Sequence, residues 1–379
     1  MARPPRWTAA VLAALVVSAW AGQGPAGVAA RAQPGGGPTL DIYFIDTEGG
    51  QATLYVAPSG QTLLVDTGNA GGRDLDRILA VFHEAGITRI DHLFLTHYHA
   101  DHYGNLVELT KRLPVGRVYD HGPASEHTAP IAAFEQAYAD VTRTVPRTVV
   151  TPGDIVPVAG LDVIVVASDN RALARPIAGA PGAGAANAVC GTVAAREEAA
   201  VDDNHNSAGF VLRYGRFRTL NLGDLTWSRE GRLMCPSSNI GAVDLYLTTH
   251  HGLDRSGSPA VVHAVRPRVA IMNNGTRKGG AVQSFETLEA SPGFEDVWQL
   301  HWSYAAGLEH NAPGVRIANL DAPDQLAAIV AGAAAPPAGP GGRADHAPAH
   351  YLKVTARKDG AFAVTNSRNG YTKQYAARP

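Results

Sequence analysis

The chain has 379 residues, of which 45% are hydrophobic and 17% are charged, so it can bury a large core. From length alone, two domains would be expected. The formal net charge at pH 7 is only −2. This near-neutral balance gives no sign of the strongly basic surface by which many proteins bind nucleic acid, but it does not exclude a phosphodiester substrate.

The N-terminus has the pattern of an export signal. Arg3 and Arg6 precede the apolar segment 9–21, which is short for a membrane span but has the length of a signal-peptide core. We expect cleavage after Ala32; the alternative is an uncleaved anchor. In either case the folded part is expected in the periplasm or outside the cell. No later segment is long and apolar enough to span a bilayer.

Three histidines and one aspartate fall within six positions directly after the apolar run 90–95. The run predicts a buried strand, and the polar cluster begins where that strand must end. Because alternate residues of an extended segment point the same way, His97 and His99 can converge on one ion. The adjacent pair Asp101 and His102 can hold a second ion beside it. Borderline metals prefer this mixture of nitrogen and oxygen ligands, so the pattern predicts a metal site; the alternative is a chance surface cluster.

Other predicted strands also end in polar motifs. The motifs are Asp66-Thr67-Gly68 after strand 62–65, Gly223-Asp224 after strand 217–222, and His250-His251-Gly252 after strand 244–249. With His97-x-His99-x-Asp101-His102, they resemble the metallo-β-lactamase superfamily over roughly residues 40 to 320. The double-His-Gly motif and the segment from Asp46 to Gln51 resemble most closely the hydrolase domain of bacterial ComEC-type competence proteins.

The resemblance implies an α/β protein with the four-layer αβ/βα metallo-β-lactamase fold. It also implies two divalent ions, zinc or else manganese, with these ligands: His97 and His99 for the first ion, Asp101, His102 and His250 for the second, and Asp224 bridging both. Asp66 and Asp46 are expected to orient the ligands through hydrogen bonds. Two such ions lower the pKa of a shared water to about 7 and supply hydroxide as the nucleophile.

Several roles stay open at this stage. His205 is either a third imidazole on the first ion or a polar loop residue. His250 is the favoured ligand because it directly follows its strand, which leaves His251 as a general acid or as a loop cap. Arg277 and Lys278 either bind an anionic group of the substrate or are solvated surface charges. The candidate catalytic residues are Asp101, His251 and Gln51.

The two cysteines, Cys190 and Cys235, fit an oxidising compartment, and a disulfide between them is the simplest interpretation. Two free buried thiols are the alternative. Cys190 lies in a long insertion, residues 169–203, whose part 177–188 is rich in Ala, Gly and Pro. Loops of this length are uncommon unless they serve a function, so we expect the insertion to border the active site.

The C-terminal part contains a low-complexity tract, 327–349, that predicts a linker. Beyond it, segments 351–356 and 361–365 alternate in polarity around Lys358-Asp359-Gly360, which predicts a β-hairpin packed on the main domain. The expected organisation is a signal peptide (1–32), a flexible leader (33–38), one hydrolase domain (39–320), a linker (321–349) and a C-terminal hairpin segment (350–379).

Three classes of function fit these features. The first is an exported two-metal hydrolase of phosphodiesters, acting on nucleic acid or another phosphorylated polymer. The second is a hydrolase of lactams, lactones or thioesters, because the same hydroxide attacks acyl carbon. The third is a non-enzymatic metal-dependent binding module. The expected partner is a small-molecule or polymer substrate; nucleic acid fits the phosphodiester chemistry, but the net charge does not indicate it.

Overall fold

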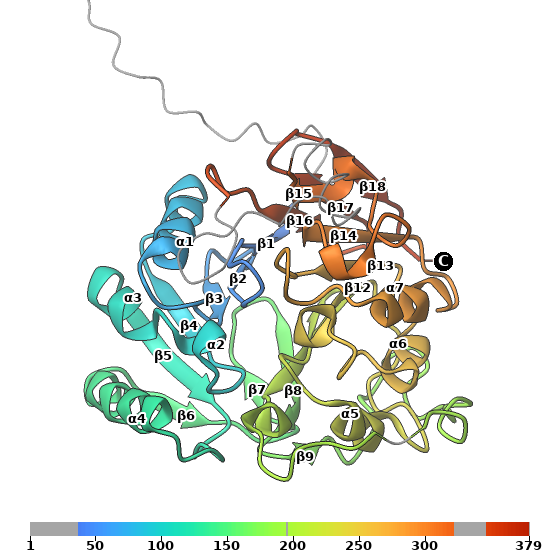
Figure 1. Cartoon of the computed structure of the whole chain (residues 1–379), viewed down its shortest axis with the longest axis horizontal. Coiled ribbons are helices and arrows are strands. Elements are labelled where there is room, and N and C mark those ends of the chain that lie inside the picture. The colour runs from blue at the N-terminus through green and yellow to red at the C-terminus, as the bar shows by residue number, and fades with distance from the viewer. Residues whose placement is uncertain (1–36, 195, 322–345, 379) are drawn as a thin grey trace, which may run out of the picture. The chain divides into compact units, whose positions relative to one another are not determined.

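The computed structural model describes residues 37–321, except residue 195, and residues 346–378 (Figure 1). The expected signal peptide, residues 33–36 of the expected leader and residues 322–345 of the expected linker lie outside this part of the chain. Within the described part, no helix has both the length and the apolar composition needed to cross a membrane.

Two mixed β-sheets form the centre of the fold. The first has the order β18-β17-β16-β1-β2-β3-β4-β5-β6, and the second has the order β15-β14-β13-β12-β11-β10-β8-β7, with β9 paired to β8. The strands of the first sheet are β1 (Leu40–Phe44), β2 (Thr53–Val56), β3 (Thr62–Val65), β4 (Ile90–Phe94), β5 (Val115–Asp120), β6 (Arg147–Val149), β16 (Leu352–Ala356), β17 (Phe362–Asn366) and β18 (Thr372–Tyr375). Those of the second are β7 (Ile155–Val156), β8 (Asp162–Ser168), β9 (Arg171–Ala172), β10 (Gly209–Tyr214), β11 (Phe217–Asn221), β12 (Leu245–Leu247), β13 (Val269–Met272), β14 (Asp296–His301) and β15 (Ile317–Asn319).

Helices flank both sheets (Figure 1). Beside the first sheet lie α1 (Arg73–Glu84), α2 (Ala100–Tyr103), α3 (Leu106–Arg112) and α4 (Ala129–Thr142). Beside the second lie α5 (Trp227–Met234), α6 (Pro259–Val265) and α7 (Val282–Glu289). Short 3₁₀ turns are η1 (Asp203–Asn206), η2 (Thr249–Gly252), η3 (Tyr304–Ala306) and η4 (Gly314–Arg316).

Three apolar clusters account for the layers. The central one joins the two sheets and includes Phe94 of β4 and Phe210 of β10, whose rings meet edge to face at 5.3 Å. A second cluster packs α1, α3 and α4 on the first sheet, and a third packs α5, α6 and α7 on the second. Along β4, Leu93 and Leu95 belong to the helix-side cluster while Phe94 faces the other sheet, because successive side chains of a strand point to opposite faces. The predicted four-layer αβ/βα fold is confirmed.

The C-terminal hairpin is part of the first sheet rather than an attachment to its surface. Strands β16 and β17 form the predicted antiparallel pair, and β18, which the sequence did not predict, extends it. β16 also pairs antiparallel with β1, with Ile42 opposite Val354. The hairpin therefore covers what would otherwise be the exposed edge of β1.

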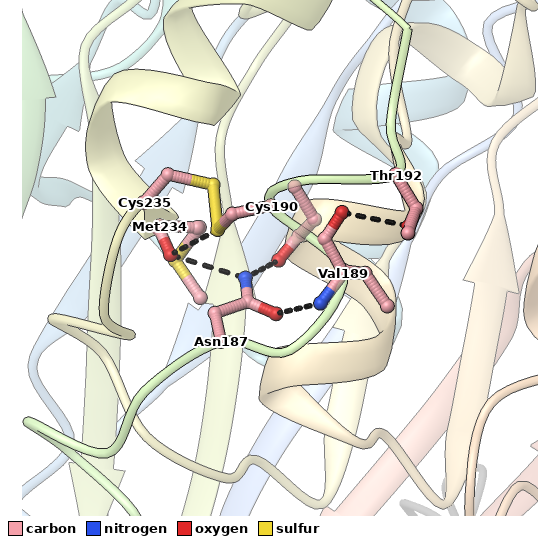
Figure 2. The surroundings of a disulfide bond; sticks show 7 residues. Asn187, Val189, Cys190, Thr192, Met234 and Cys235 are labelled. Atoms are coloured by element: carbon pink, nitrogen blue, oxygen red, sulfur yellow. Dashed lines mark hydrogen bonds between the residues drawn. A yellow bond between two sulfur atoms is a disulfide. The ribbon is translucent and has the colours of Figure 1, made fainter.

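The predicted disulfide is present: Cys190 and Cys235 are bonded, with their Cα atoms 5.7 Å apart (Figure 2). The bond ties the insertion to the end of α5. Asn187 adds to this tether, because its side-chain amide donates to the backbone carbonyls of Met234 and Ala260 at 3.0 and 2.8 Å. The insertion is thus held at a fixed place although it has little regular structure.

We predict that the denatured, unreduced protein shows no titratable thiol and that the reduced protein shows two. Replacing both cysteines by serine should lower the free energy of unfolding by about 2–4 kcal/mol, since the closed loop restricts the unfolded chain. Thiol titration and denaturant unfolding measure the two effects. Two thiols in the unreduced sample would contradict the bond.

Candidate metal centre

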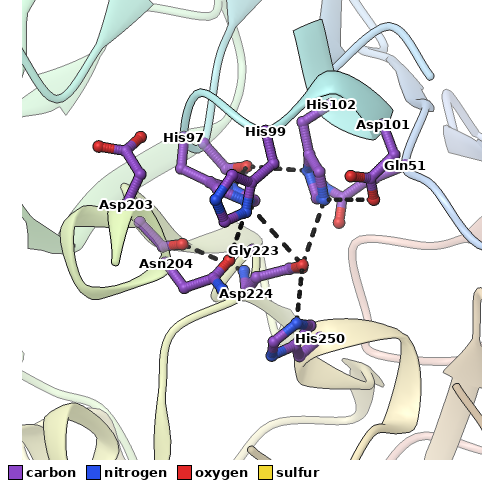
Figure 3. Close-up of polar contacts among 12 residues, drawn as sticks. Gln51, His97, His99, Asp101, His102, Asp203, Asn204, Gly223, Asp224 and His250 are labelled. Carbon is purple, nitrogen blue, oxygen red and sulfur yellow. Dashed lines mark hydrogen bonds and ion pairs between the residues drawn. The ribbon is translucent and has the colours of Figure 1, made fainter. Parts of the chain in front are cut away.

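The carboxyl ends of strands from both sheets meet at one place, and the predicted metal-binding side chains other than His205 lie there (Figure 3). Asp66 follows β3, and the loop from His97 to His102 follows β4. In the other sheet, Asp224 follows β11 and His250 follows β12. β3 and β4 are parallel neighbours, as are β11 and β12, so the loops after them emerge on the same edge of each sheet.

One carboxylate oxygen lies at the centre of this group. Asp224 Oδ2 is 3.3 Å from His102 Nε2, 3.4 Å from His250 Nε2, 3.2 Å from His251 Nε2 and 4.0 Å from His97 Nε2. All five side chains are buried. A single carboxylate surrounded by four imidazoles has the arrangement required of a ligand shared by two ions.

Four residues make the tightest set. The ligand atoms of Asp101, His102, Asp224 and His251 all lie within 4.8 Å of one another. Asp101 Oδ2 is 3.3 Å from His102 Nε2 and 3.4 Å from His251 Nε2. Both Nε2 atoms and Asp224 Oδ1 are buried without a hydrogen-bond partner. Because buried polar atoms rarely stay unpaired, this donor set fits a divalent cation.

His97 and His99 form the other half of the centre. His97 Nε2 lies 3.1 Å from His99 Nδ1, so these two nitrogens can share one ion. The other nitrogen of His99, Nε2, donates to Glu126 Oε1 at 3.0 Å. A carboxylate on the far nitrogen sets the tautomer and leaves the lone pair of Nδ1 facing the site. The amide oxygen of Asn204 lies 3.1 Å from the same Nδ1.

Asp66 holds the metal loop from behind. Its carboxylate accepts a hydrogen bond from His102 Nδ1 at 2.7 Å, which orients the ring so that Nε2 is directed at Asp224. It also accepts from the Thr96 backbone N–H and hydroxyl at 2.8 and 2.7 Å. Gly223, with φ +55°, packs on the same threonine, since an added Cβ would lie 2.7 Å from Thr96 Cβ. Glycine is therefore required where the β11 loop crosses the metal loop.

The double-histidine loop has an unusual backbone. His250 and His251 are both in the left-handed region, with φ +56° and +58°, where residues other than glycine are disfavoured. Two consecutive left-handed residues turn both rings toward Asp224. Strain of this kind persists where surrounding contacts over-determine the backbone, and it often marks a functional site.

The electrostatics of the group favour bound cations. Burial alone lowers the pKa of His102, but Asp224, Asp101 and Asp66 outweigh it and raise this pKa well above its usual value. Burial lowers the pKa of His250 to about 4, so that ring is neutral at pH 7 and free to bind a metal. The carboxylates thus create a negative potential that positive charge must balance.

Comparison with known proteins agrees with this geometry. The family model described as the metallo-beta-lactamase superfamily matches residues 46–172, which include the whole metal loop and Asp66. The matched segment is similar to this superfamily. The chain is 39% identical over 66 residues to a metal-dependent hydrolase of Staphylococcus saprophyticus, and 33% identical over 79 residues to an atrochrysone carboxyl ACP thioesterase of Emericella nidulans. These matches cover 17% and 20% of this chain, and the chain spans about a quarter of the length of each relative.

The solved structures similar to this chain are more distant in sequence. The metallo-beta-lactamase fold protein YhfI from Bacillus subtilis is 12% identical, with a TM-score of 0.42 over 69% of this chain and 96% of that one. A mutant of the CmlA beta-hydroxylase is 17% identical, with a TM-score of 0.42 over 70% of this chain and 53% of that one.

Within the candidate metal centre, both adjacent histidines contact Asp224, although only His250 was favoured as a ligand. His251, not His250, joins Asp101, His102 and Asp224 in the tightest set. Its Nδ1 lies 3.1 Å from the Asn273 side-chain amide, and an added Cβ on Gly279 would lie 2.1 Å from the His251 carbonyl oxygen. The loop after β13 thus packs directly on His251. His250 contacts the same carboxylate, and its Nδ1 lies 3.2 Å from Ser256 Oγ.

Two further expectations need correction or refinement. His205 is not in the metal group; its Nε2 lies 3.5 Å from Glu198 Oε2, because the ring of this η1 residue faces the insertion. Its neighbour Asn204 faces His99 instead. Gln51 does lie at the site: its N–H donates to the Asp101 carbonyl at 3.1 Å, and its side-chain amide reaches Asn221 at 3.5 Å (Figure 3).

Lys278 and Arg277 lie on the loop after β13, and Lys278 reaches the metal group. Its Nζ is 2.5 Å from Asp101 Oδ2, so it is paired with a candidate ligand rather than being a solvated surface charge. Burial and Asp321 raise the pKa of Tyr304, and the charge of nearby Arg277 opposes this rise. Positive charge therefore borders the second-ion set on this side.

Asp46, which was expected to orient the metal ligands, belongs to a separate ionic cluster. Its carboxylate lies 2.6 Å from His301 Nε2 and 2.9 Å from Arg77. The neighbouring Glu48 accepts from His346 Nδ1 at 2.9 Å, and His346 Nε2 lies 3.1 Å from Asp321. These are hydrogen-bond distances, unlike the 3.2–3.4 Å spacing around Asp224, so the cluster is a set of ion pairs. It joins Asp321 to His346, the residues on either side of 322–345.

Three residues that contact the ligands were not predicted. Asn204 lies in the Asn-rich turn in which His205 was a candidate ligand, and Asn273 lies in the turn that contains Arg277 and Lys278. The sequence therefore pointed to both turns, but not to these two asparagines. Glu126 had none, because an isolated glutamate in a loop is ordinary. Sequence alone could not show that it folds onto His99.

We predict that His346→Gln lowers the free energy of unfolding most at acidic and neutral pH. Burial opposes protonation, but Asp321 and Glu48 raise the pKa of His346 to about 10. The unfolded value is about 6.5, so the stabilisation is complete below that pH and disappears as the pH rises through 10. We expect a loss of about 3 kcal/mol near pH 6, by analogy with other buried pairs. Urea unfolding from about pH 6 to 10.5 measures this loss in the free energy of unfolding. The control is His127→Gln, at an exposed histidine. A loss that does not change with pH would contradict the pairing.

We also predict that Asp224→Ala lowers the metal content of the purified protein from about two ions while the fold persists. One carboxylate oxygen serves both halves of the centre, so its loss weakens both. Elemental analysis and circular dichroism measure the two quantities. Asp162→Ala, at a largely exposed site on β8, is the matched control. Full occupancy in Asp224→Ala would rule out a shared ligand.

Proposed function

We propose that this protein is an exported metal-dependent hydrolase. The observation that supports this most directly is the set of unpaired, buried nitrogens of His102 and His251 around one oxygen of Asp224. The matched superfamily and the metal-dependent hydrolase relative support the same class of activity. A non-enzymatic binding module explains less well why the two adjacent histidines are held in a strained backbone.

The proposed chemistry assigns a task to each group of side chains. Two divalent ions, when bound, supply hydroxide at neutral pH and take up negative charge on the attacked group. Asp66, Glu126 and the amide of Asn273 hold the rings of His102, His99 and His251 in place. Lys278 keeps a positive charge beside Asp101, where an anionic substrate oxygen would approach.

Export is part of the proposal. It rests on Arg3 and Arg6 before the apolar segment 9–21, and on the disulfide, which is typical of oxidising compartments. The expected location is the periplasm or the medium.

For the substrate we propose a phosphodiester. The Gly-Gly-Gln turn ending at Gln51 and the double-His-Gly motif resemble ComEC-type hydrolase domains, and Lys278 adds positive charge at the centre. The second candidate is acyl hydrolysis, which the partial match to a thioesterase favours. Because the net charge is −2, any cleavage of nucleic acid should be weak and should fall steeply with salt.

We predict metal-dependent cleavage of bis-p-nitrophenyl phosphate and at least about a 100-fold loss in His99→Ala, because the variant removes a metal ligand. The assay uses zinc and then manganese, with nitrocefin, a lactone and a thioester as the acyl substrates. His127→Ala, an exposed histidine one residue after Glu126, is the control.

The outcomes separate the candidates. Lactam, lactone or thioester turnover, with phosphodiester cleavage no higher than in His99→Ala, would replace the first candidate by the second. Metal binding without turnover of any of these substrates would favour the binding module.

A further inference from the structure

A cavity of about 230 Å³ lies beside the metal centre, and the proposed reaction does not use it. The insertion, η1, the start of α5 and the loop after η2 together form its walls. Arg196, Glu198, Asp202, His205, Trp227 and Arg255 are among the lining residues.

Asp202 connects the cavity to the metal centre. Its carboxylate and the ligand atoms of His99 and Glu126 lie within 4.8 Å of one another. Asn204, two residues further along η1, contacts His99 directly. A substrate whose reacting group is held by an ion at His97 and His99 would therefore place the group next to its reacting bond close to this cavity.

The wall contributed by the insertion is held firmly. Glu198 accepts from the Ser228 N–H at 2.7 Å and from the Thr226 hydroxyl at 3.1 Å, so it binds the N-terminal turn of α5. The Arg196 guanidinium lies 3.8 Å from the centroid of the Trp227 ring. Trp227 Nε1 donates to the Ala194 carbonyl at 3.1 Å. These contacts, with the disulfide, make the cavity a built site rather than a gap between loops.

Apart from the exposed carboxylate of Glu197, the polar groups left for a ligand are hydrogen-bond donors. The buried carboxylates are already engaged: Glu198 by α5, and Asp202 by the Asn204 N–H at 2.9 Å and Arg255 at 3.3 Å. Arg255 is 58% exposed, and its contact with Asp202 is a single N···O distance, although a guanidinium has five N–H donors. His205 is only 5% exposed, and its Nε2 has no hydrogen-bond partner. Burial, together with Arg229, lowers the pKa of His205, so its ring is neutral.

We propose that this cavity is a recognition subsite for an anionic oxygen group of the substrate, a carboxylate or a phosphate, carried next to the bond that is cleaved. Arg255 supplies the charge and His205 an N–H at the floor of the cavity. The insertion therefore selects the substrate, while the superfamily motifs bind the metals. The assignment as a substrate subsite rests on the proposed function; the anion site itself does not.

The test is isothermal titration of the full metal-loaded protein with sodium phosphate and, separately, sodium acetate at constant ionic strength. The variants are Arg255→Ala and His205→Ala, with Arg143→Ala, at an exposed residue directly after α4, as the matched control. The Asp224→Ala variant serves to remove anion binding that depends on bound metal. Any anion binding that remains in this variant therefore comes from another site. We expect one anion to bind in Asp224→Ala, and about tenfold weaker binding when Arg255 or His205 is also replaced, because each removes a hydrogen bond to a charged group.

The preferred anion identifies the group: tighter acetate binding indicates a carboxylate, and tighter phosphate binding a phosphate. Loss of all anion binding in Asp224→Ala, or equal binding in Arg255→Ala and Arg143→Ala, would overturn the subsite. Binding requires no turnover. A protein that cleaves none of the test esters but binds the anion through Arg255 would therefore reject the proposed function and retain the site.

Discussion

The arrangement of the centre depends on one oxygen atom. Asp224 Oδ2 lies among imidazoles from the loop after β4 and from the loop after β12, so it joins the two sheets at their shared edge. Like-charged or neutral rings would not gather there without the carboxylate, and a buried carboxylate would not be stable without balancing positive charge. The left-handed backbone of His250 and His251 follows from this requirement, because an extended loop would direct only one of two adjacent rings at the same oxygen.

The same residue types give a different result elsewhere in the chain. Around Asp46, histidine nitrogens and carboxylate oxygens approach to 2.6–2.9 Å, which leaves room for a proton and nothing larger. Around Asp224 the corresponding distances are 3.2–3.4 Å, and two of the histidine nitrogens there have no hydrogen-bond partner. Spacing, rather than composition, therefore separates the two groups. In this chain the group around Asp224 is the candidate metal centre, and the group around Asp46 joins Asp321 to His346.

Much of the fold was predictable because its signals are local. Runs such as 62–65 are apolar, short and followed by polar turns, and the structure has strands there. The metal loop was predictable because its ligands are close in sequence. The choice between His250 and His251 was not, since it depends on a left-handed turn and on Asn273, which is 22 residues away. Glu126 and the β18 strand were missed for the same reason: their roles arise from long-range packing that no local pattern records.

The insertion, residues 169–203, offers a way for this protein to select its substrate without a change in the candidate metal ligands. The metal ligands all come from strand ends that the fold itself places, so they leave little freedom to vary the substrate. Residues 169–203 are not constrained in this way; they are held by one disulfide and by contacts with α5. Such a segment can bring Arg196 and Glu198 beside Asp202 without disturbing the candidate metal ligands. Because the fold does not determine the substrate, the side chains that do so should lie on this segment and on the loops that it contacts.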